Sequence, residues 1–383
     1  MSLNRIMYRI PFNIPHYTGN ETKYLLEAAE TGKISGNGLF TQKCHAFFEN
    51  QLGYPKVLLT TSCTDALEMA AILCKIEPED EVIVPSFTFV STANAFILRG
   101  AKIVFVDSGK LNPNLDVNQL EKLITPKTKA IVVVHYAGVA CDMDHIMTLA
   151  KKYGLLVIED AAHSIDAFYK GRKLGTIGHL AAFSFHETKN IMSGEGGMLV
   201  INDKRFEQRA EIIWEKGTNR AAFQRGEVDK YNWQDVGSSF LPSELTAAVL
   251  FAQLEKLNDI QQKRIHIWNL YRKSLSNLET KGFIRLPHIP EHASNNGHLY
   301  YLICKSQQER DALIKYLAAH GIQAVFHYLP LHKSDFYLSV NSEHDLPNAE
   351  FFSQRIVRLP LFYSITDEMI AEVCDRVRSF FSR

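Results

Sequence analysis

LLVIEDAAH, residues 155–163, is the stretch that decides the fold, because four apolar residues in a row lead there into two adjacent carboxylates. An apolar run without polar alternation is typical of a strand buried on both faces of a parallel sheet. Side chains at the carboxyl edge of such a sheet lie where α/β proteins bind their ligands. We therefore expect Asp160 to face a ligand site.

Apolar runs of strand length alternate with helical patterns on both sides of this stretch, from about residue 55 to 203. Helix-length segments such as 64–74 and 142–153 separate them, which indicates a mostly parallel sheet covered on both faces. A further strand is expected directly before the hydroxyl residues at 60–64. The other expected strands are 81–85, 102–107, 130–135, 155–160, 181–185 and 197–201.

The C-terminal part has a different pattern. Residues 243–281 stay helical far longer than an average helix, and we expect one long connector there. Strand-like runs at 298–304 and 324–328 lie between helical segments and predict a smaller α+β unit. The expected division is a large α/β domain at 11–248 and a small C-terminal domain at 249–383. Residues 215–239 are polar and poorly periodic, so they form either a functional, mobile segment or a solvated surface loop.

The overall charge excludes several classes of function. The 383 residues include 42 Lys and Arg against 42 Asp and Glu, so no global field favours nucleic acid or an anionic membrane. Hydrophobic residues make up 46% of the chain, which is ordinary for a globular protein with sizeable cores. Any anionic ligand must therefore be held by local groups in loops.

The six cysteines are scattered without a C-x-x-C pair, so neither a zinc cluster nor a disulfide framework is expected. No run of about eighteen apolar residues is present, and no apolar N-terminal stretch precedes a cleavage site. We expect a cytoplasmic protein with reduced thiols and no membrane segment. The acidic residues of DMDH at 142–145 open a helical pattern, where capping explains them, and we expect no metal there or at Glu159, Asp160 and His163.

A lysine follows the carboxylate strand in FSFHETKN, residues 183–190. Pyridoxal phosphate (PLP) chemistry requires an amine for a Schiff base and an acid for the pyridine nitrogen, and Lys189 and Asp160 meet both needs. The alternative is a solvated lysine and an aspartate that only caps the next helix.

Two further segments fit the same cofactor. In TTSCTDAL, residues 60–67, hydroxyl groups precede a helical pattern, so backbone N–H groups and Thr64 would cradle a phosphate, with simple N-capping as the alternative. Ser184 would add a second hydroxyl. In PSFTF, residues 85–89, an aromatic ring would stack on a flat ligand, unless it belongs to the core.

Taken together, SCTDAL (62–67), PSFTF (85–89), EDAAH (159–163) and SFHETKN (184–190) resemble the DegT-type sugar-nucleotide aminotransferases. The order and spacing match over nearly the whole chain. The resemblance implies fold type I of the PLP enzymes, with a large, mostly parallel seven-stranded sheet and a smaller α+β C-terminal domain. VSTANAF (90–96), HYAGVAC (135–141) and FHYLPLH (326–332) are most similar to the branch that forms dTDP-4-amino-4,6-dideoxy-D-galactose.

The resemblance also implies roles for individual residues. Lys189 would form the Schiff base and move the proton, and Asp160 would pair with the ring nitrogen. His163 would lie near the phenolic oxygen, where many relatives carry Gln. The remaining cofactor residues would be Phe89 on the ring, Thr64, the Asp65 backbone and Ser184 on the phosphate, and Ser239 on the partner subunit's phosphate, where many relatives carry Asn. Candidates for the nucleotide-sugar pocket are Lys216, Arg220, Tyr328 and His332.

The implied reaction moves the amino group of L-glutamate to dTDP-4-keto-6-deoxy-D-glucose and leaves 2-oxoglutarate. The product would serve cell-surface polysaccharides such as lipopolysaccharide or enterobacterial common antigen. The enzyme would be a homodimer with shared active sites.

Several alternatives remain open. The product could be the gluco epimer, or the acceptor another keto-sugar nucleotide. A dehydratase of the same fold is disfavoured, because that branch carries histidine in place of Lys189. A PLP-binding regulatory protein without turnover is disfavoured by the presence of Lys189 and Asp160, because binding alone needs no group that moves a proton. An NAD-dependent oxidoreductase is disfavoured because no G-x-G-x-x-G follows an early strand.

Overall fold

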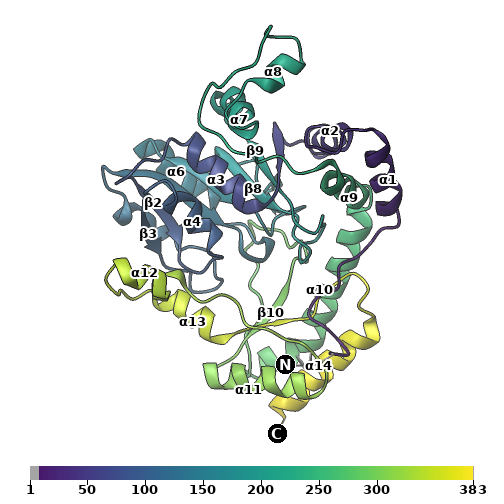
Figure 1. Cartoon of the computed structure of the whole chain (residues 1–383). Coiled ribbons are helices and arrows are strands. Elements are labelled where there is room, and N and C mark those ends of the chain that lie inside the picture. The colour runs from purple at the N-terminus through teal and green to yellow at the C-terminus, as the bar shows by residue number, and fades with distance from the viewer. Residues whose placement is uncertain (1–7, 383) are drawn as a thin grey trace, which may run out of the picture.

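The computed structural model describes residues 8–382 and is built around one large sheet (Figure 1). Its seven strands lie in the order β1-β9-β8-β5-β4-β2-β3. Strand β9 runs antiparallel to both of its neighbours, and the other pairs are parallel. The bounds are β1 (Val57–Thr60), β2 (Glu81–Pro85), β3 (Lys102–Val106), β4 (Thr128–Val134), β5 (Leu156–Asp160), β8 (Leu180–Ser184) and β9 (Gly197–Ile201). The prediction of a mostly parallel α/β sheet is confirmed.

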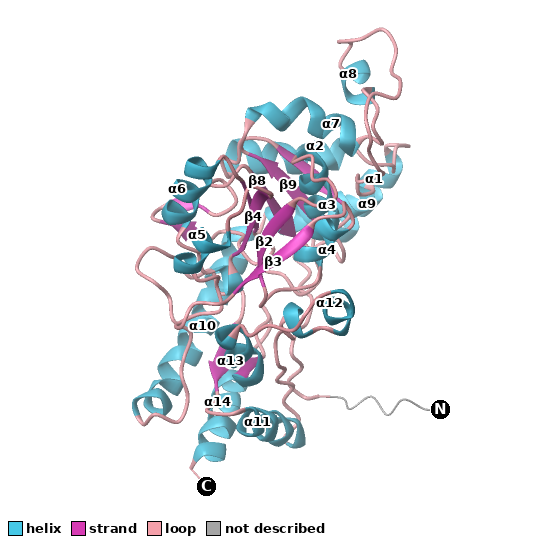
Figure 2. Cartoon of the chain, turned by 90° about the vertical axis from the view of Figure 1, so that its left-hand side faces the viewer, coloured by secondary structure: helices cyan, strands magenta, loops and turns pink. Residues whose placement is uncertain are grey.

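The apolar runs form strands because both faces of the sheet are covered (Figure 2). In β4, Ala130 and Val132 join one core with α3 (Cys63–Leu73) and α4 (Ser91–Ile97). Their neighbours Ile131 and Val133 join another core with α6 (Met143–Tyr153). Successive side chains of a strand point to opposite faces, so a strand covered on both sides has to be apolar throughout.

Two further helices, α2 (Leu39–Ala46) and α9 (Glu244–Leu254), pack over the β1 end of the sheet with α1 (Glu21–Glu30). The remaining helices before the second unit are α5 (Leu120–Leu123), α7 (Glu207–Trp214) and α8 (Arg220–Gln224). A small hairpin consists of β6 (Phe168–Tyr169) and β7 (Arg172–Lys173).

A second unit lies below the large sheet in Figure 1. Its strands β10 (Tyr300–Ile303) and β11 (Ile356–Leu359) pair antiparallel and share a core with α10, α11 and α14. Ile10 belongs to the same core, so the N-terminal segment packs here. The helices are α10 (Leu257–Thr280), α11 (Gln307–Ala319), α12 (Asp335–Val340), α13 (Pro347–Arg355) and α14 (Asp367–Phe381). The division of the chain at 248/249 stays a prediction.

The expected single helix over 243–281 is wrong, because α9 ends at Leu254 and α10 begins at Leu257. Lys256, with φ −111° and ψ 12°, lies outside the helical region. Just before it, the Glu255 carboxylate accepts hydrogen bonds from the Tyr24 hydroxyl at 2.8 Å and the Asn20 amide at 3.1 Å. The break therefore occurs where the chain is tied to the start of the molecule.

The expected strand over 324–328 is also wrong beyond one residue, since only Val325 forms a bridge, with Arg358. The chain then leaves the small sheet for the large unit, where the Leu331 N–H donates to the Ser86 carbonyl at 2.9 Å. In residues 8–382, no helix is long and apolar enough to cross a membrane.

Candidate active site

A cavity of about 590 Å³ opens where β4, β5 and β8 end, between the large sheet and the second unit. Parallel strands present their carboxyl ends at one edge, which is the usual binding position in such sheets. Seven of the residues singled out from the sequence line this cavity: Thr64, Phe89, Asp160, His163, Ser184, Lys189 and Tyr328.

Asp160 ends β5 and is held by two donors. The Thr92 hydroxyl donates to Oδ2 at 2.7 Å, and the Ala162 N–H donates to Oδ1 at 3.2 Å. Thr92 is itself 2.7 Å from the Thr88 hydroxyl, which also lines the cavity. Burial raises the pKa of Asp160, while these hydrogen bonds and the Lys189 charge oppose that rise. The carboxylate is thus fixed in one orientation.

Lys189 follows a turn in which its backbone N–H donates to the His186 carbonyl at 2.9 Å. Burial lowers the pKa of its amine, and the nearby Arg358 charge acts in the same direction, while Cys63 and Asp160 oppose it. A lysine needs its neutral form to act as a nucleophile, and desolvation favours that form.

His163 is buried and stacks on His298, with ring centroids 4.1 Å apart. Burial and the Lys189 charge hold the pKa of His163 well below its usual range, so the ring is neutral. The Ala137 N–H donates to Nδ1 at 3.3 Å, which assigns the proton to Nε2. His163 therefore offers one N–H donor.

Hydroxyl groups gather at the start of α3. Ser62 is the N-cap, and its Oγ accepts the Asp65 N–H at 3.1 Å. Thr64 Oγ1 is 2.7 Å from Ser91 Oγ, and both residues line the cavity. A Cβ on Gly197 would lie 2.3 Å from the Ser62 carbonyl carbon, so the missing side chain lets β9 approach the helix start. A helix N-terminus with hydroxyl groups on the cavity wall suits a phosphate.

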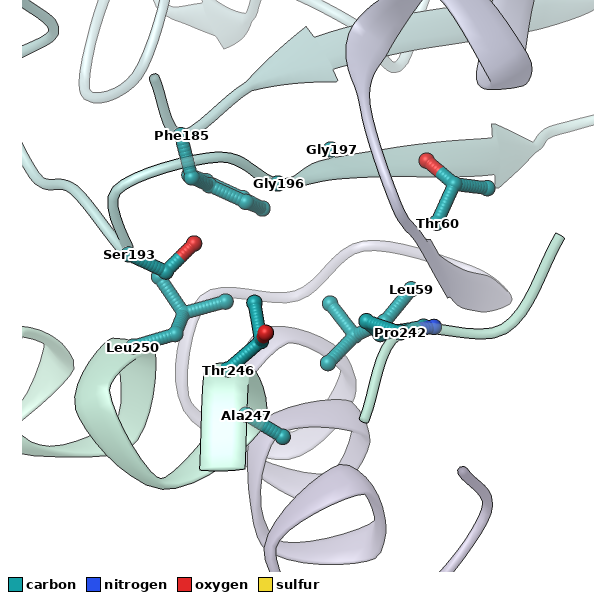
Figure 3. A pocket seen from close by; sticks show the side chains of 10 residues that line it. All are labelled: Leu59, Thr60, Phe185, Ser193, Gly196, Gly197, Pro242, Thr246, Ala247 and Leu250. Atoms are coloured by element: carbon teal, nitrogen blue, oxygen red, sulfur yellow. The ribbon is translucent and has the colours of Figure 1, made fainter. Parts of the chain in front are cut away.

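A second, narrower crevice backs this region (Figure 3). It lies between Phe185, Gly196 and the first two turns of α9, where Thr246 and Leu250 project toward the strands. The crevice has no room for a water molecule. It is a packing seam that supports the cavity from behind.

Five predicted residues do not line the cavity. Asp65 lies beside it, and its N–H is engaged by Ser62 as a helix cap. His332 is fully buried, with Nδ1 2.6 Å from Ser86 Oγ and Nε2 3.2 Å from Glu350 Oε1. The other three, Lys216, Arg220 and Ser239, belong to an arm over 215–239 that carries α8 at the top of Figure 1. Their roles stay predictions.

Four residues of the site escaped the sequence analysis: Thr92, His298, His327 and Arg358. Thr92 lies one helical turn after Thr88, but nothing in that spacing points to Asp160. The other three come from the second unit and reach the cavity only through tertiary packing. In residues 8–382, no cluster of three or more His, Cys, Asp or Glu could hold a metal ion.

Known proteins match this chain over nearly its whole length. The model of the DegT/DnrJ/EryC1/StrS aminotransferase family matches residues 15–378. GDP-perosamine synthase of Escherichia coli O157:H7 is 33% identical over 380 residues, which cover 98% of this chain and 100% of that protein.

Solved structures agree. DesV of S. venezuelae, in complex with a ketimine intermediate, has a TM-score of 0.89 at 30% identity, covering 98% of this chain and 99% of that one. Spr1654 of Streptococcus pneumoniae in its PLP form has a TM-score of 0.88 at 26% identity, covering the same shares.

Proposed function

The chain belongs to the DegT/DnrJ/EryC1/StrS aminotransferase family, and from that premise we propose that it aminates C4 of dTDP-4-keto-6-deoxy-D-glucose with L-glutamate. The products are dTDP-4-amino-4,6-dideoxy-D-galactose and 2-oxoglutarate. The family and fold make it a PLP-dependent, fold type I aminotransferase of nucleotide sugars. The dTDP carrier, the acceptor and the product's configuration are the proposal.

One observation supports the transamination chemistry on which the proposal rests: the Lys189 amine and a doubly held Asp160 share one cavity that also has hydroxyls at a helix start. PLP, when bound, supplies a carbonyl for the amine and a ring that accepts electrons. The residues fit this group, because Thr64 and Ser91 line the cavity at the start of α3 and Asp160 has no salt-bridge partner within residues 8–382.

The protein's own groups then have distinct tasks. Lys189 would hold the cofactor covalently, and once freed its amine would take the Cα proton of glutamate and later deliver a proton at C4 of the sugar. Asp160 would keep a proton on the ring nitrogen. His163 would offer its Nε2–H to the phenolic oxygen, and Phe89, with 56% of its surface exposed, would be the aromatic residue available to the ring.

The test is a panel assay. The purified holoenzyme is incubated with glutamate and with dTDP- and GDP-linked 4-keto-6-deoxy sugars, and the products are identified by mass spectrometry. We expect the dTDP sugar to be aminated fastest. If a GDP-linked sugar is aminated fastest instead, the proposed dTDP-linked acceptor is wrong. Amination of a GDP-linked sugar is the second candidate function, since GDP-perosamine synthase is among the relatives.

The configuration at C4 follows from the face that Lys189 protonates. We propose the axial amine of the galacto sugar, on the strength of the resemblance in VSTANAF, HYAGVAC and FHYLPLH. Proton NMR of the product decides it. A small coupling between H3 and H4 indicates the axial amine, and a large trans-diaxial coupling would establish the gluco epimer instead.

The proposal extends to assembly and place. The enzyme acts as a homodimer with composite sites, in the cytoplasm, for cell-surface polysaccharide. Its six cysteines are free thiols, as a reducing compartment requires.

A further inference from the structure

Arg358 stands in β11 and projects into the cavity from the second unit. Its backbone is fixed on both sides, paired with Tyr301 in β10 and bridged to Val325. The guanidinium carbon lies 4.8 Å from the centre of the Phe12 ring, and one terminal nitrogen donates to the Phe326 carbonyl at 3.1 Å. The side chain is therefore held in place while part of its donor capacity is unused.

Arg358 is half-buried and lacks the carboxylate partner that a cation largely removed from solvent normally has. Among residues 8–382, no carboxylate lies within salt-bridge distance of it, and its Nε is buried without a hydrogen-bond partner. Burial also lowers the pKa of Arg358, and the groups that oppose this are the phenols of Tyr136 and Tyr328, not a carboxylate. A planar fork of donors that is kept unpaired on a cavity wall suits a planar oxyanion.

We propose that Arg358 binds a carboxylate of the amino donor, an assignment that rests on the proposed function and deepens it. The amine of a dicarboxylic amino acid would displace Lys189 from the cofactor, so its carboxylates must lie near that residue. Arg358 is near enough for its charge to act on the Lys189 amine. A fork of two N–H groups would hold the carboxylate in plane and orient the Cα–H toward the lysine.

The diphosphate of a nucleotide sugar fits this position less well. It is attached at C1 of the hexose, whereas the reacting carbon is C4, so the sugar ring separates the phosphates from Lys189. The cofactor phosphate has its own cradle at the start of α3, where Thr64 and Ser91 pair. Of the anionic groups that enter this site, the donor carboxylate comes closest to the reacting amine.

The test compares Arg358→Gln and Arg358→Lys with a matched control, Arg355→Gln. Arg355 also lies over an aromatic ring, 4.4 Å from the centre of Phe351, and donates to a backbone carbonyl, that of Lys305, at 3.0 Å. It does not line the cavity. Calorimetry of each holoenzyme measures the dissociation constant of glutarate, a dicarboxylate without an amine. The two half-reactions are followed separately by cofactor absorbance, first with glutamate and then with the keto-sugar nucleotide.

We expect Arg358→Gln to weaken glutarate binding and raise the KM for glutamate by roughly 10- to 100-fold. The keto-sugar half-reaction should change by less than about threefold. Arg358→Lys keeps the charge without the planar fork of donors, so its glutarate affinity should lie between those of the wild type and Arg358→Gln. The lysine variant also keeps the proposal testable if the glutamine variant fails to fold. Arg355→Gln should bind glutarate as the wild type does.

Two arms locate the carboxylate. If glutamate and alanine lose affinity alike, Arg358 holds the α-carboxylate, and if only glutamate does, it holds the distal one. Unchanged glutarate binding in both Arg358 variants would overturn the proposal, and so would a loss confined to the keto-sugar half-reaction. A wild type that reacts with glutamate through Arg358 but aminates no dTDP sugar would reject the proposed acceptor and leave this inference standing.

Discussion

Asp160 depends on a neighbour that does not touch the reacting groups. Thr92 supplies one of its two hydrogen bonds, at 2.7 Å from a buried hydroxyl. Hydrogen bonds to charged groups contribute about 1.5–3 kcal/mol. Thr92→Val should therefore lower kcat by roughly tenfold or more and raise the pKa of Asp160 further, because burial then acts with less opposition.

A pH titration of the bound cofactor's absorbance, together with kcat, checks this. Thr148→Val is the control, since its hydroxyl donates only to the Asp144 carbonyl on the exposed side of α6. Wild-type kcat and titration in the Thr92 variant would mean that the Ala162 N–H alone is sufficient.

Lys189 combines the covalent anchor and the proton carrier in one amine. Lys189→Ala should remove the Schiff-base absorbance and nearly all turnover, with an unchanged circular dichroism spectrum. The exposed Lys204→Ala serves as the control. Most of the activity surviving in Lys189→Ala would contradict the assignment.

The sequence could predict the residues of this site that stand in contiguous motifs. Asp160 and Ser184 end strands, and Thr64 opens a helix, so the local sequence pattern alone was sufficient to predict that they lie at the same edge of the large sheet. Arg358 could not be found in this way, because its role depends on the distance between two units that only the folded chain sets.

At the scale of elements, the contact between β9 and the start of α3 is the tightest point of the cradle. An alanine at Gly197 would place its Cβ 2.4 Å from the Cys63 nitrogen. Overpacking of this kind costs about 1–3 kcal/mol. We expect Gly197→Ala to lower Tm and to weaken cofactor binding, measured by fluorescence titration. Gly109→Ala, whose Cβ would approach nothing nearer than 3.6 Å, should do neither.

A histidine links α2 to β1 and gives the fold a pH dependence. The Leu59 N–H donates to His45 Nε2 at 3.0 Å, and burial lowers the pKa of His45 to about 3. The unfolded chain, with a pKa near 6.5, binds more protons between these values, so stability is full above pH 6.5 and is lost as pH falls.

Between pH 7 and 5 this group alone should remove about 2 kcal/mol from the free energy of unfolding. Urea denaturation at both pH values measures the loss. His45→Gln should show a smaller difference than the wild type, and the exposed His288→Gln should not. An equal loss in the His45 variant would mean that other buried histidines carry the effect.

Elements were predicted well where their burial is uniform. Strands β2 and β9 match their expected bounds residue for residue, because both are apolar runs buried on both faces. The break between α9 and α10 escaped prediction, since the apolar stripe continues through it and only the contact of Glu255 with Tyr24 marks the turn.

At the scale of the whole molecule, the 215–239 arm carries large aromatic side chains that no other part of the described chain covers. Trp233 is 81% exposed and Tyr231 is 52% exposed. We expect the arm to reach the partner's site in a homodimer. Mixing a Lys189→Ala protomer with a Ser239→Asp protomer should then restore activity above either parent, because one of the two composite sites is intact. Hybrids no more active than the parents would contradict shared sites.

The N-terminal segment of the described chain reaches the cavity beside β11. Ile10 pairs with the segment around Ile322, through Ile10 N–H to the Gly321 carbonyl at 3.0 Å and Gln323 N–H to the Ile10 carbonyl at 2.9 Å. Phe12 then lies against Arg358. This N-terminal segment joins the first described residues to β11, the last strand of the described chain.

During synthesis on the ribosome, the residues of the site are therefore made in two stages. Lys189 and the phosphate cradle are translated together in the first two-thirds of the chain, whereas Arg358 comes near its end. Residues 8–12 are translated before residues 321–323 and 358, so they have to wait unpaired for these partners. A messenger cut short after α12 would thus yield a chain that has every large-sheet residue of the cofactor site but lacks Arg358, the residue proposed to bind the amino donor.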